Sequence, residues 1–583
     1  MKKISLALLA AIVLISCDFS KYRMVKEYDF VTRFEKSGGT ETATYDEVID
    51  FYKQLADAYP SVQLQEFGKT DSGEPLRLAV FNPTGDFKFD NIRKDKSIIL
   101  INNGIHPGES DGIDATMMLF RDLAGDSIKV PENTVIATIP VYNIGGALNR
   151  NSTTRTNQNG PKEYGFRGNA RNYDLNRDFI KADTKNTRAF YQIFHEVQPD
   201  VFIDNHVSDG ADYQYTLTHL FTQHNKLGGE LGKYLDDRLM PALEDSLKKK
   251  KLDITPYVNV FNTVPEKGFS QFLDNPRYST GYTTLWNTLG MMVETHMLKP
   301  YEQRVKADYE LMRSMINITS TETFNIKDVR ERARRKYLTD RWYPLHFEPD
   351  MENPSKRQFK GYEGKMEPSE VTGGDRLKYD RSKPFTKEID YYDNFKAQNQ
   401  IEIPRAYIIP QGWWNVVDLL KLNDIKMIPF KRDTTLLVET YRIQDFKTSK
   451  KAFEGHYPHS ETKVSTSMDS IHFRKGDFLV KTFQDGARYL LETLEPTATD
   501  SFFNWNFFDS VLQQKEGFSP YVFEDIAKKM LNEDADLKKE FEEKKRKDTE
   551  FAKDSQAQLK WLHRHSPHYE EAHLRYPIFR LPR

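Results

Sequence analysis

Residues 98–109 read IILINNGIHPGE. The first four residues are apolar and three of them are β-branched, which predicts a strand buried on both faces, as in the middle of a parallel sheet. Asn103-Gly104 and Pro107-Gly108 end this strand in a loop. The loop carries His106 and Glu109, whose imidazole and carboxylate groups are both zinc ligands in proteins. The stretch therefore predicts a metal site at the end of a central strand.

Strands and helices alternate along residues 43–325, and several of the strands are wholly apolar. We expect strands at 77–81, 98–101, 135–141, 201–203 and 291–293, and helices at 48–59, 113–123 and 187–197. This alternation predicts an α/β domain with a mainly parallel mixed sheet flanked by helices. Ligands of such sheets gather beyond the carboxyl ends of the strands.

Two further predicted strands end in residues that suit a hydrolytic metal site. The strand in residues 199–208 ends near His206, and the strand in residues 289–295 runs into Glu294. A glutamate is costly to bury unless it is paired or functional. Burial raises the pKa of a carboxyl group, which is what a general base near neutral pH needs. Together with His106 and Glu109, these residues supply three metal ligands and a base.

Between these segments, residues 172–179 read NYDLNRDF. The chain therefore contains His-x-x-Glu, Asp-x-Asn-Arg-x-Phe, a strand-terminal His with Ser two places on, and a strand-terminal Glu, in that order. This order resembles the carboxypeptidase A-like zinc metallocarboxypeptidases over residues 40–325. The resemblance implies a zinc carboxypeptidase-like catalytic domain at residues 43–325 and one zinc ion per chain.

The resemblance also implies roles for individual residues. It implies that the zinc ligands are His106, Glu109 and His206. It implies that Glu294 is the general base. It also implies that Asn176 and Arg177 bind the terminal carboxylate of the substrate. The planar guanidinium of Arg177 suits this role, because it can donate two hydrogen bonds to one carboxylate.

The family also uses a second arginine to stabilise the oxyanion and a tyrosine over the substrate. For the arginine we favour Arg155 over Arg150, and for the tyrosine Tyr278 over Tyr282. The chain departs from the pancreatic enzymes at Gly108, where they have an arginine, and in lacking their disulfides. Residues 281–290 are also shortened, so the preferred C-terminal side chain is not predicted.

The implied reaction is hydrolysis of the C-terminal peptide bond by zinc-bound water, with Glu294 as the base. Peptides are the expected partners. One alternative is a zinc deacylase or amidohydrolase that acts on N-acyl amino acids, because that class shares His-x-x-Glu and the distal His. A second is a non-enzymatic surface lipoprotein that binds peptides or glycans. Retention of Glu294 argues against the second alternative, since a binding protein has no need of a base.

The N-terminus predicts a bacterial lipoprotein. Residues 1–3 are a short positive segment, residues 4–15 are an apolar run too short to span a bilayer comfortably, and LISC follows at residues 14–17. Cys17 is the single cysteine of the chain, so no intramolecular disulfide and no cysteine-ligated zinc is possible. We expect cleavage before Cys17, a lipid anchor on it and attachment to a membrane of the cell envelope. A plain secretory signal is the alternative.

Length and composition set further limits. A chain of 583 residues predicts at least two domains, and a net charge of -2 gives no basic excess for nucleic acid. We expect a polar spacer at residues 18–42. Residues 326–583 are expected to form an accessory region of mixed α/β or β-rich character, with a linker or loosely structured extension at 348–384. The aromatic cluster at 502–508 is interpreted as core packing. The oligomeric state is not predicted.

Overall fold

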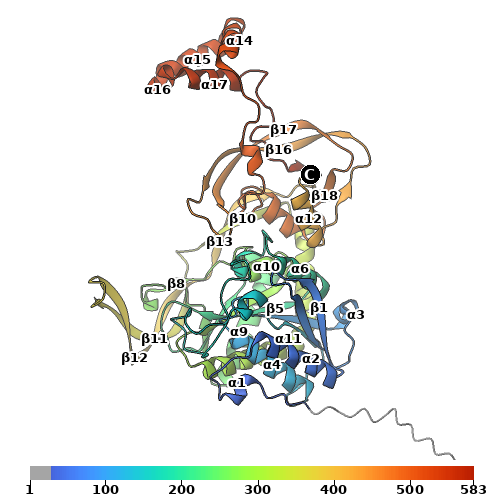
Figure 1. Ribbon diagram of the computed structural model, residues 1–583, viewed down its shortest axis with the longest axis vertical. Coiled ribbons are helices and arrows are strands. Elements are labelled where there is room, and N and C mark those ends of the chain that lie inside the picture. The colour runs from blue at the N-terminus through green and yellow to red at the C-terminus, as the bar shows by residue number, and fades with distance from the viewer. Residues whose placement is uncertain (1–27) are drawn as a thin grey trace, which may run out of the picture.

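The computed structural model describes residues 28–583 (Figure 1). The predicted signal with Cys17, and residues 18–27 of the predicted spacer, lie outside the described residues. The described part of that spacer is not a free linker, because it packs on the folded body. It contains the short helix α1 (Arg33–Lys36), and the buried ring of Phe34 meets Tyr301 edge-on at 5.7 Å between centroids.

An eight-stranded sheet forms the centre of the N-terminal domain, by which we mean residues 28–339. Its order is β1-β2-β4-β3-β5-β9-β6-β7. The strands are β1 (Val62–Lys69), β2 (Pro75–Phe81), β3 (Ser97–Asn103), β4 (Thr134–Ile139), β5 (Val201–Ser208), β6 (Leu217–Phe221), β7 (Ile254–Pro256) and β9 (Leu289–His296). The central strands β4, β3, β5 and β9 run parallel, whereas β1, β2 and β6 join the sheet antiparallel. The predicted mixed sheet is therefore confirmed.

Helices cover both faces of this sheet. Ile99 and Ile101 of β3 point into one core with α2 (Tyr45–Ala58), α4 (Asp111–Ala124), α8 (Gly229–Tyr234), α9 (Met240–Lys249) and α11 (Tyr301–Thr339). Ile98 and Leu100 point into the other core with α3 (Phe89–Asp95), α6 (Lys185–Val197) and α10 (Ser279–Thr284). Because alternate side chains of a strand face opposite sides, the middle of a strand that is buried on both faces is a continuous apolar run, as in Ile98–Ile101.

A second sheet lies in residues 403–583, which we call the C-terminal domain. Its six strands run antiparallel in the order β15-β18-β14-β19-β16-β17. They are β14 (Ala406–Ile409), β15 (Ile428–Pro429), β16 (Thr434–Thr448), β17 (His459–Phe473), β18 (Phe478–Lys481) and β19 (Phe579–Leu581), and α12 (Trp414–Leu422) and α13 (Ala487–Leu494) accompany them. This confirms the predicted β-rich C-terminal region. The domain boundary predicted after residue 325 falls inside α11.

The prediction of a linker at residues 348–384 was wrong. This segment lies largely in β11 (Ser355–Pro368) and β12 (Asp375–Tyr392), which pair antiparallel as a long hairpin that projects from the body (Figure 1). The base of the hairpin pairs with β8 (Phe269–Ser270), and the neighbouring strands β10 (Trp342–Pro349) and β13 (Phe395–Glu402) pair with each other. The base of the hairpin buries Phe359, Ile389 and Tyr391, but its projecting part is mostly exposed. The alternation of apolar residues that signals a strand is therefore short.

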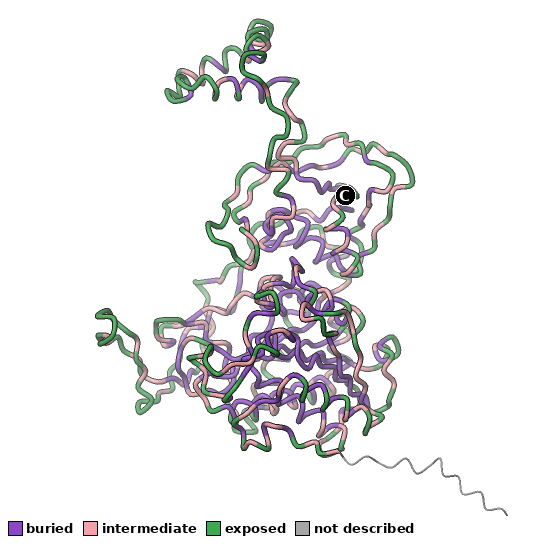
Figure 2. Tube along the Cα trace, in the orientation of Figure 1, coloured by how far each residue is buried: buried purple, intermediate pink, exposed green. Residues whose placement is uncertain are grey.

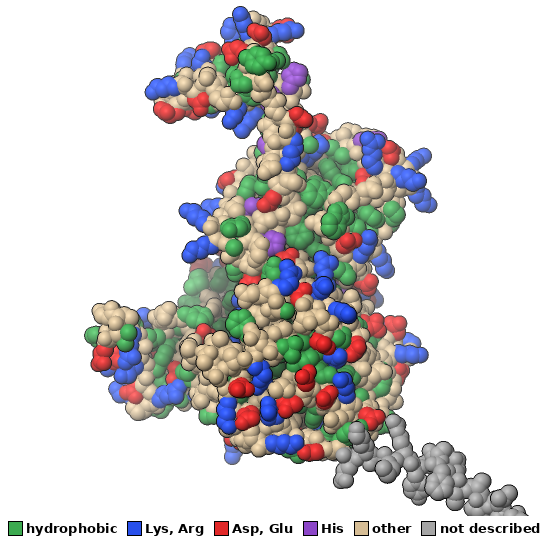
Figure 3. All heavy atoms as spheres, in the orientation of Figure 1, with side chains coloured by type: hydrophobic (Ala, Val, Ile, Leu, Met, Phe, Trp, Pro, Cys, Tyr) green, Lys and Arg blue, Asp and Glu red, His purple; other side chains and the backbone are tan. Residues whose placement is uncertain are grey.

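Four helices near the C-terminus form a small separate group. They are α14 (Pro520–Glu533), α15 (Ala535–Lys547), α16 (Thr549–Lys553) and α17 (Ser555–Arg564), and they have their own apolar core. Figure 2 shows that most of this group is exposed. Within residues 28–583, no helix combines the length and the apolar character needed to span a bilayer. On the face seen in Figure 3, acidic and basic side chains are intermixed.

The two domains share one apolar core. Trp286 of the N-terminal domain stacks on Tyr489 of α13 at 5.8 Å between centroids. The buried Arg488 donates hydrogen bonds to the backbone carbonyls of Lys226 and Leu227 across the same interface. The aromatic cluster at 502–508 is also core, because Phe502, Phe503, Trp505 and Phe508 are each at most 1% exposed. The structure therefore supports core packing for this cluster.

Candidate metal centre

The three predicted strand ends meet at one edge of the central sheet. His106 lies in the loop after β3, and Gly104 begins that loop with φ of +65°, in the left-handed region that favours glycine. His206 lies in β5, directly opposite Glu294 of β9 in the register of that parallel pair. Because β3, β5 and β9 run parallel, their carboxyl ends place all three side chains at the same edge.

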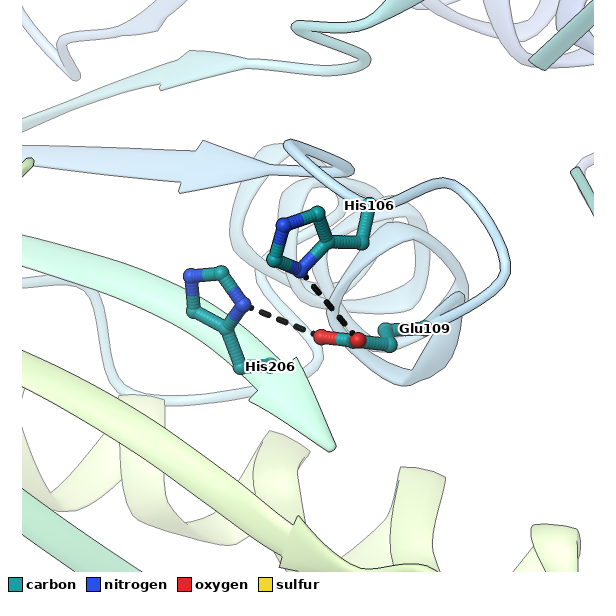
Figure 4. A group of neighbouring side chains, drawn as sticks. All are labelled: His106, Glu109 and His206. Atoms are coloured by element: carbon teal, nitrogen blue, oxygen red, sulfur yellow. Dashed lines mark hydrogen bonds and ion pairs between the residues drawn. The ribbon is translucent and has the colours of Figure 1, made fainter. Parts of the chain in front are cut away.

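His106, Glu109 and His206 surround a single point, as Figure 4 shows. Glu109 Oε1 lies 3.2 Å from His106 Nδ1, and Glu109 Oε2 lies 3.0 Å from His206 Nδ1. One ligand atom from each residue lies within 4.8 Å of the others. Although it is buried, His106 Nδ1 makes no hydrogen bond within residues 28–583. Two imidazole nitrogens and one carboxylate are a ligand set that fits zinc.

A carboxylate holds the far nitrogen of each histidine. His106 Nε2 lies 2.9 Å from Asp174 Oδ1, and His206 Nε2 lies 3.0 Å from Asp204 Oδ2. Such partners fix the orientation of metal-binding imidazoles and leave Nδ1 for the metal. The sequence analysis assigned no role to either aspartate. The spacing of Asp204 did carry a signal, because a residue two places before His206 on a strand lies on the same face.

Charge is balanced within the buried cluster. Burial alone would raise the pKa of Glu109, but His106 and Arg155 lower it well below the usual range. Burial opposes protonation of His206, yet Asp204 and Glu109 raise its pKa well above 6.5. A metal ion must displace a proton from His206, so metal affinity should weaken as the pH falls.

Glu294 has the electrostatic character expected of a base. Loss of contact with water inside the site raises the pKa of Glu294 to about 8, and the negative charges of Glu109 and Asp204 also raise it. His206 and Arg167 act in the opposite direction. The structure thus places Glu294 beside the predicted ligands, where a carboxylate accepts a proton near neutral pH.

Two arginines border Glu109. Arg155 Nη2 lies 2.8 Å from Glu109 Oε1, and Arg167 Nη1 lies 3.6 Å from the same oxygen. A Cβ on Gly108 would lie 2.6 Å from Arg155 Cδ, so the glycine makes room for this arginine. Arg150 is elsewhere and donates to the backbone carbonyl of Ala43. The structure therefore brings together Arg155 and Arg167, and the sequence analysis missed Arg167.

The predicted carboxylate-binding pair lies on a short 3-10 helix, η2 (Leu175–Arg177). Asp174 caps this helix by accepting a hydrogen bond from the backbone N–H of Asn176 at 2.9 Å. The side-chain oxygen of Asn176 accepts a hydrogen bond from the N–H of Ser279 at 3.1 Å. Asp174 therefore joins the orientation of His106 to the position of Asn176 and Arg177.

The two candidate tyrosines have different environments. The guanidinium carbon of Arg177 lies 4.6 Å from the centroid of the Tyr278 ring. Tyr282 is fully buried in the core, and its hydroxyl donates to Asn423 at 2.7 Å. The structure therefore places Tyr278 next to Arg177 and keeps Tyr282 away from it.

Residues 48–212 match the family model described as zinc carboxypeptidase. The matched range lies within the N-terminal domain, which is therefore similar to zinc carboxypeptidases over these residues. The matched range contains His106, Glu109 and His206 and ends before Glu294. The prediction of this family from ordered motifs is confirmed.

Relatives found by sequence match most of the chain, and solved structures match about half of it. Carboxypeptidase 2 of the fungus Trichophyton rubrum is 24% identical over 494 residues, which cover 80% of this chain and 84% of the relative. A metallo-carboxypeptidase from Burkholderia cenocepacia is 17% identical with a TM-score of 0.36, covering 48% of this chain and 70% of its own. Carboxypeptidase A from Helicoverpa armigera is 14% identical with a TM-score of 0.37, and the match covers 48% of this chain and 74% of the Helicoverpa chain. The family match and the fungal relatives favour the carboxypeptidase domain over the deacylase alternative.

Removing one ligand tests the metal centre. The wild-type protein should bind one metal ion per chain, and His206→Ala should lose it because two ligands remain. Elemental analysis after dialysis measures this directly. His472→Ala, which changes an exposed histidine on β17, should leave the metal content unchanged. A wild-type protein that purifies without metal and takes up no added zinc would contradict the assignment.

Proposed function

We propose that this protein is a zinc-dependent carboxypeptidase that removes single residues from the C-termini of peptides. The arrangement of His106, Glu109 and His206 around one point, with Glu294 beside it, carries the proposal. It is supported by the match of residues 48–212 to the zinc carboxypeptidase family model. Metal content and peptide hydrolysis test the proposal.

The proposed roles follow from the chemistry of each group. Zinc held by His106, Glu109 and His206 would polarise the scissile carbonyl and lower the pKa of the attacking water. Glu294 accepts a proton from that water and then delivers it to the leaving amine. Because the pKa of Glu294 is raised, its carboxyl group holds the proton until the proton passes to the leaving amine.

Arg177 and Asn176 are proposed to bind the terminal carboxylate of the substrate. Arg177 Nη1 donates to the backbone carbonyl of Asn176 at 2.9 Å and lies 3.9 Å from Asp174, too far for a hydrogen bond. Within the described residues, Nε and Nη2 of Arg177 make no hydrogen bond, so that edge of the guanidinium is available to a carboxylate. Tyr278 lies against the same guanidinium and is proposed to contact the substrate there.

The oxyanion requires a positive charge near the metal. Arg155 is committed to Glu109 and, through Nε, to Gln158 at 2.7 Å. Arg167 Nη1 lies 3.6 Å from Glu109 Oε1, and its Nε donates to Asp174 Oδ2 at 3.0 Å. Both arginines are paired with carboxylates of the site, so Arg155 is proposed for the oxyanion role and Arg167 is the second candidate. A preorganised donor of this kind contributes ~3 kcal/mol.

We also propose that the protein is attached to a membrane of a bacterial cell envelope through a lipid on Cys17. The support is the sequence LISC at residues 14–17 after a short apolar run, together with the absence of any other cysteine in the chain.

Replacing Glu294 separates catalysis from binding. Glu294→Gln keeps the shape of the side chain but cannot take a proton, so kcat/KM should fall roughly 10²–10⁴-fold while metal and substrate still bind. In the wild type, kcat/KM should rise with pH as Glu294 loses its proton. The positive charge of a bound metal ion lowers the pKa of Glu294. The rise in kcat/KM should therefore occur at a pH below the pKa of about 8 that Glu294 has without the metal. Full activity of Glu294→Gln would contradict the role assigned to it.

Arg177→Ala should remove the preference for a free C-terminus. The test compares kcat/KM for one peptide with a free terminal carboxylate and for the same peptide with a terminal amide. The wild type should favour the free acid, and Arg177→Ala should treat the two peptides nearly alike because the carboxylate has lost its partner. Arg171→Ala, an exposed arginine of the same loop, serves as the control. Equal cleavage of both peptides by the wild type would argue against an exopeptidase.

Cys17→Ala tests the lipid anchor. In bacterial cells fed a labelled fatty acid, the wild type should incorporate the label and fractionate with membranes, because the thiol is the expected attachment point. The variant should remain unlabelled. If the wild type takes up no label, the anchor proposal is wrong, whatever the outcome for peptidase activity.

A further inference from the structure

A loop of the C-terminal domain returns to the metal centre. It joins β16 to β17 and spans residues 449–458. At its tip, Glu454 and Gly455 both have positive φ, 48° and 80°, and Phe453 and His456 bridge across them. A glutamate is seldom found in the left-handed region, and surrounding contacts must hold it there. Those contacts come from the N-terminal domain.

The loop tip binds the backbone beside Asp174. Glu454 Oε2 accepts a hydrogen bond at 2.8 Å from the N–H of Asp174, a residue 280 positions earlier in the chain. The carboxylate of that same Asp174 orients His106 and caps η2. A Cβ at Gly455 would lie 2.6 Å from the Tyr173 hydroxyl oxygen, so the close approach requires glycine here.

Two further contacts hold the flanks of the substrate site. His456 Nε2 lies 2.8 Å from Asp183 Oδ2, which fixes the far end of the loop that carries Asn176 and Arg177. On the other flank, Asp500 accepts hydrogen bonds from the backbone N–H and Nε of Arg277 at 2.9 Å and 2.8 Å. Arg277 immediately precedes Tyr278, whose ring lies against Arg177.

We propose that Glu454 is a positioning residue of the peptidase site, through which the C-terminal domain holds the turn that binds the substrate's terminal carboxylate. The inference rests on the proposed carboxypeptidase function. Glu454 fixes Asp174, and Asp174 caps the turn that presents Asn176 and Arg177. The site is therefore built from both domains, and the C-terminal domain is part of the substrate-binding machinery.

The test uses the full chain and the same pair of peptides, one with a free terminal carboxylate and one with an amide. Glu454→Ala should raise KM for the free peptide roughly fivefold, the usual net weight of one hydrogen bond, with a smaller change in kcat. KM for the amidated peptide should not change, because that peptide does not use Arg177. Metal content and melting temperature should remain those of the wild type.

Conservative variants distinguish positioning from general packing. Glu454→Gln retains an oxygen that accepts the Asp174 N–H, so KM should return to within about twofold of the wild type. Glu454→Asp is one methylene shorter and should behave as Glu454→Ala does. Glu461→Gln, an exposed glutamate of β17 that pairs with Lys447, is the matched control. If Glu454→Ala fails to fold, the difference in KM between Glu454→Gln and Glu454→Asp still tests whether the hydrogen bond to Asp174 positions the site.

Two results would overturn the inference. One is a Glu454→Ala variant that keeps the wild-type ratio between free and amidated peptides. The other is a Glu454→Gln variant as impaired as Glu454→Ala, which would mean that charge and not the hydrogen bond is what matters. Either result leaves the proposed function standing if the wild type is active. A wild type that hydrolyses neither peptide overturns both proposals.

Discussion

The buried carboxylate of Glu109 is the constraint on which the candidate metal centre depends. An ionised carboxylate in the interior is strongly unfavourable unless it is paired and hydrogen-bonded. Glu109 meets this requirement with His106, His206 and Arg155, and its Oε2 also accepts the N–H of Val207 at 3.1 Å. One side chain thus joins the loop after β3 to strand β5 and to the segment around residue 155.

The central sheet was accessible from sequence because its signals are local. β3, β5 and β9 are each buried on both faces, so four to eight consecutive residues reveal the strand, and the polar residue at its end reveals the site. The order of His106, Glu109, Asp-x-Asn-Arg and His206 then identified the family, which was confirmed. Roles of the individual residues remain predictions, although the structure brings the predicted ligands and Glu294 together.

What the sequence did not reveal depends on contacts between distant segments. Arg167 has no motif of its own, and only folding brings it to Glu109 and Asp174. The projecting part of the β11–β12 hairpin is mostly exposed and lacks the alternation that marks a half-buried strand, so the sequence predicts a linker or loosely structured extension there. Glu454 is separated from Asp174 by 280 positions, and no local pattern announces such a contact.

The parallel pairing of β3, β5 and β9 also has a consequence for how the chain reaches its active form. Asn102 and Asp204, neighbours in the sheet, are 102 residues apart in sequence, and the Asn176 side chain meets Ser279 at a separation of 103. Long loops must close before such contacts can form, which makes parallel sheets intrinsically slow to fold. The ribosome also completes residues 449–458 long after the metal ligands have emerged. A nascent chain therefore contains His106, Glu109 and His206 before the segment that contacts the turn at residues 174–177 has been made.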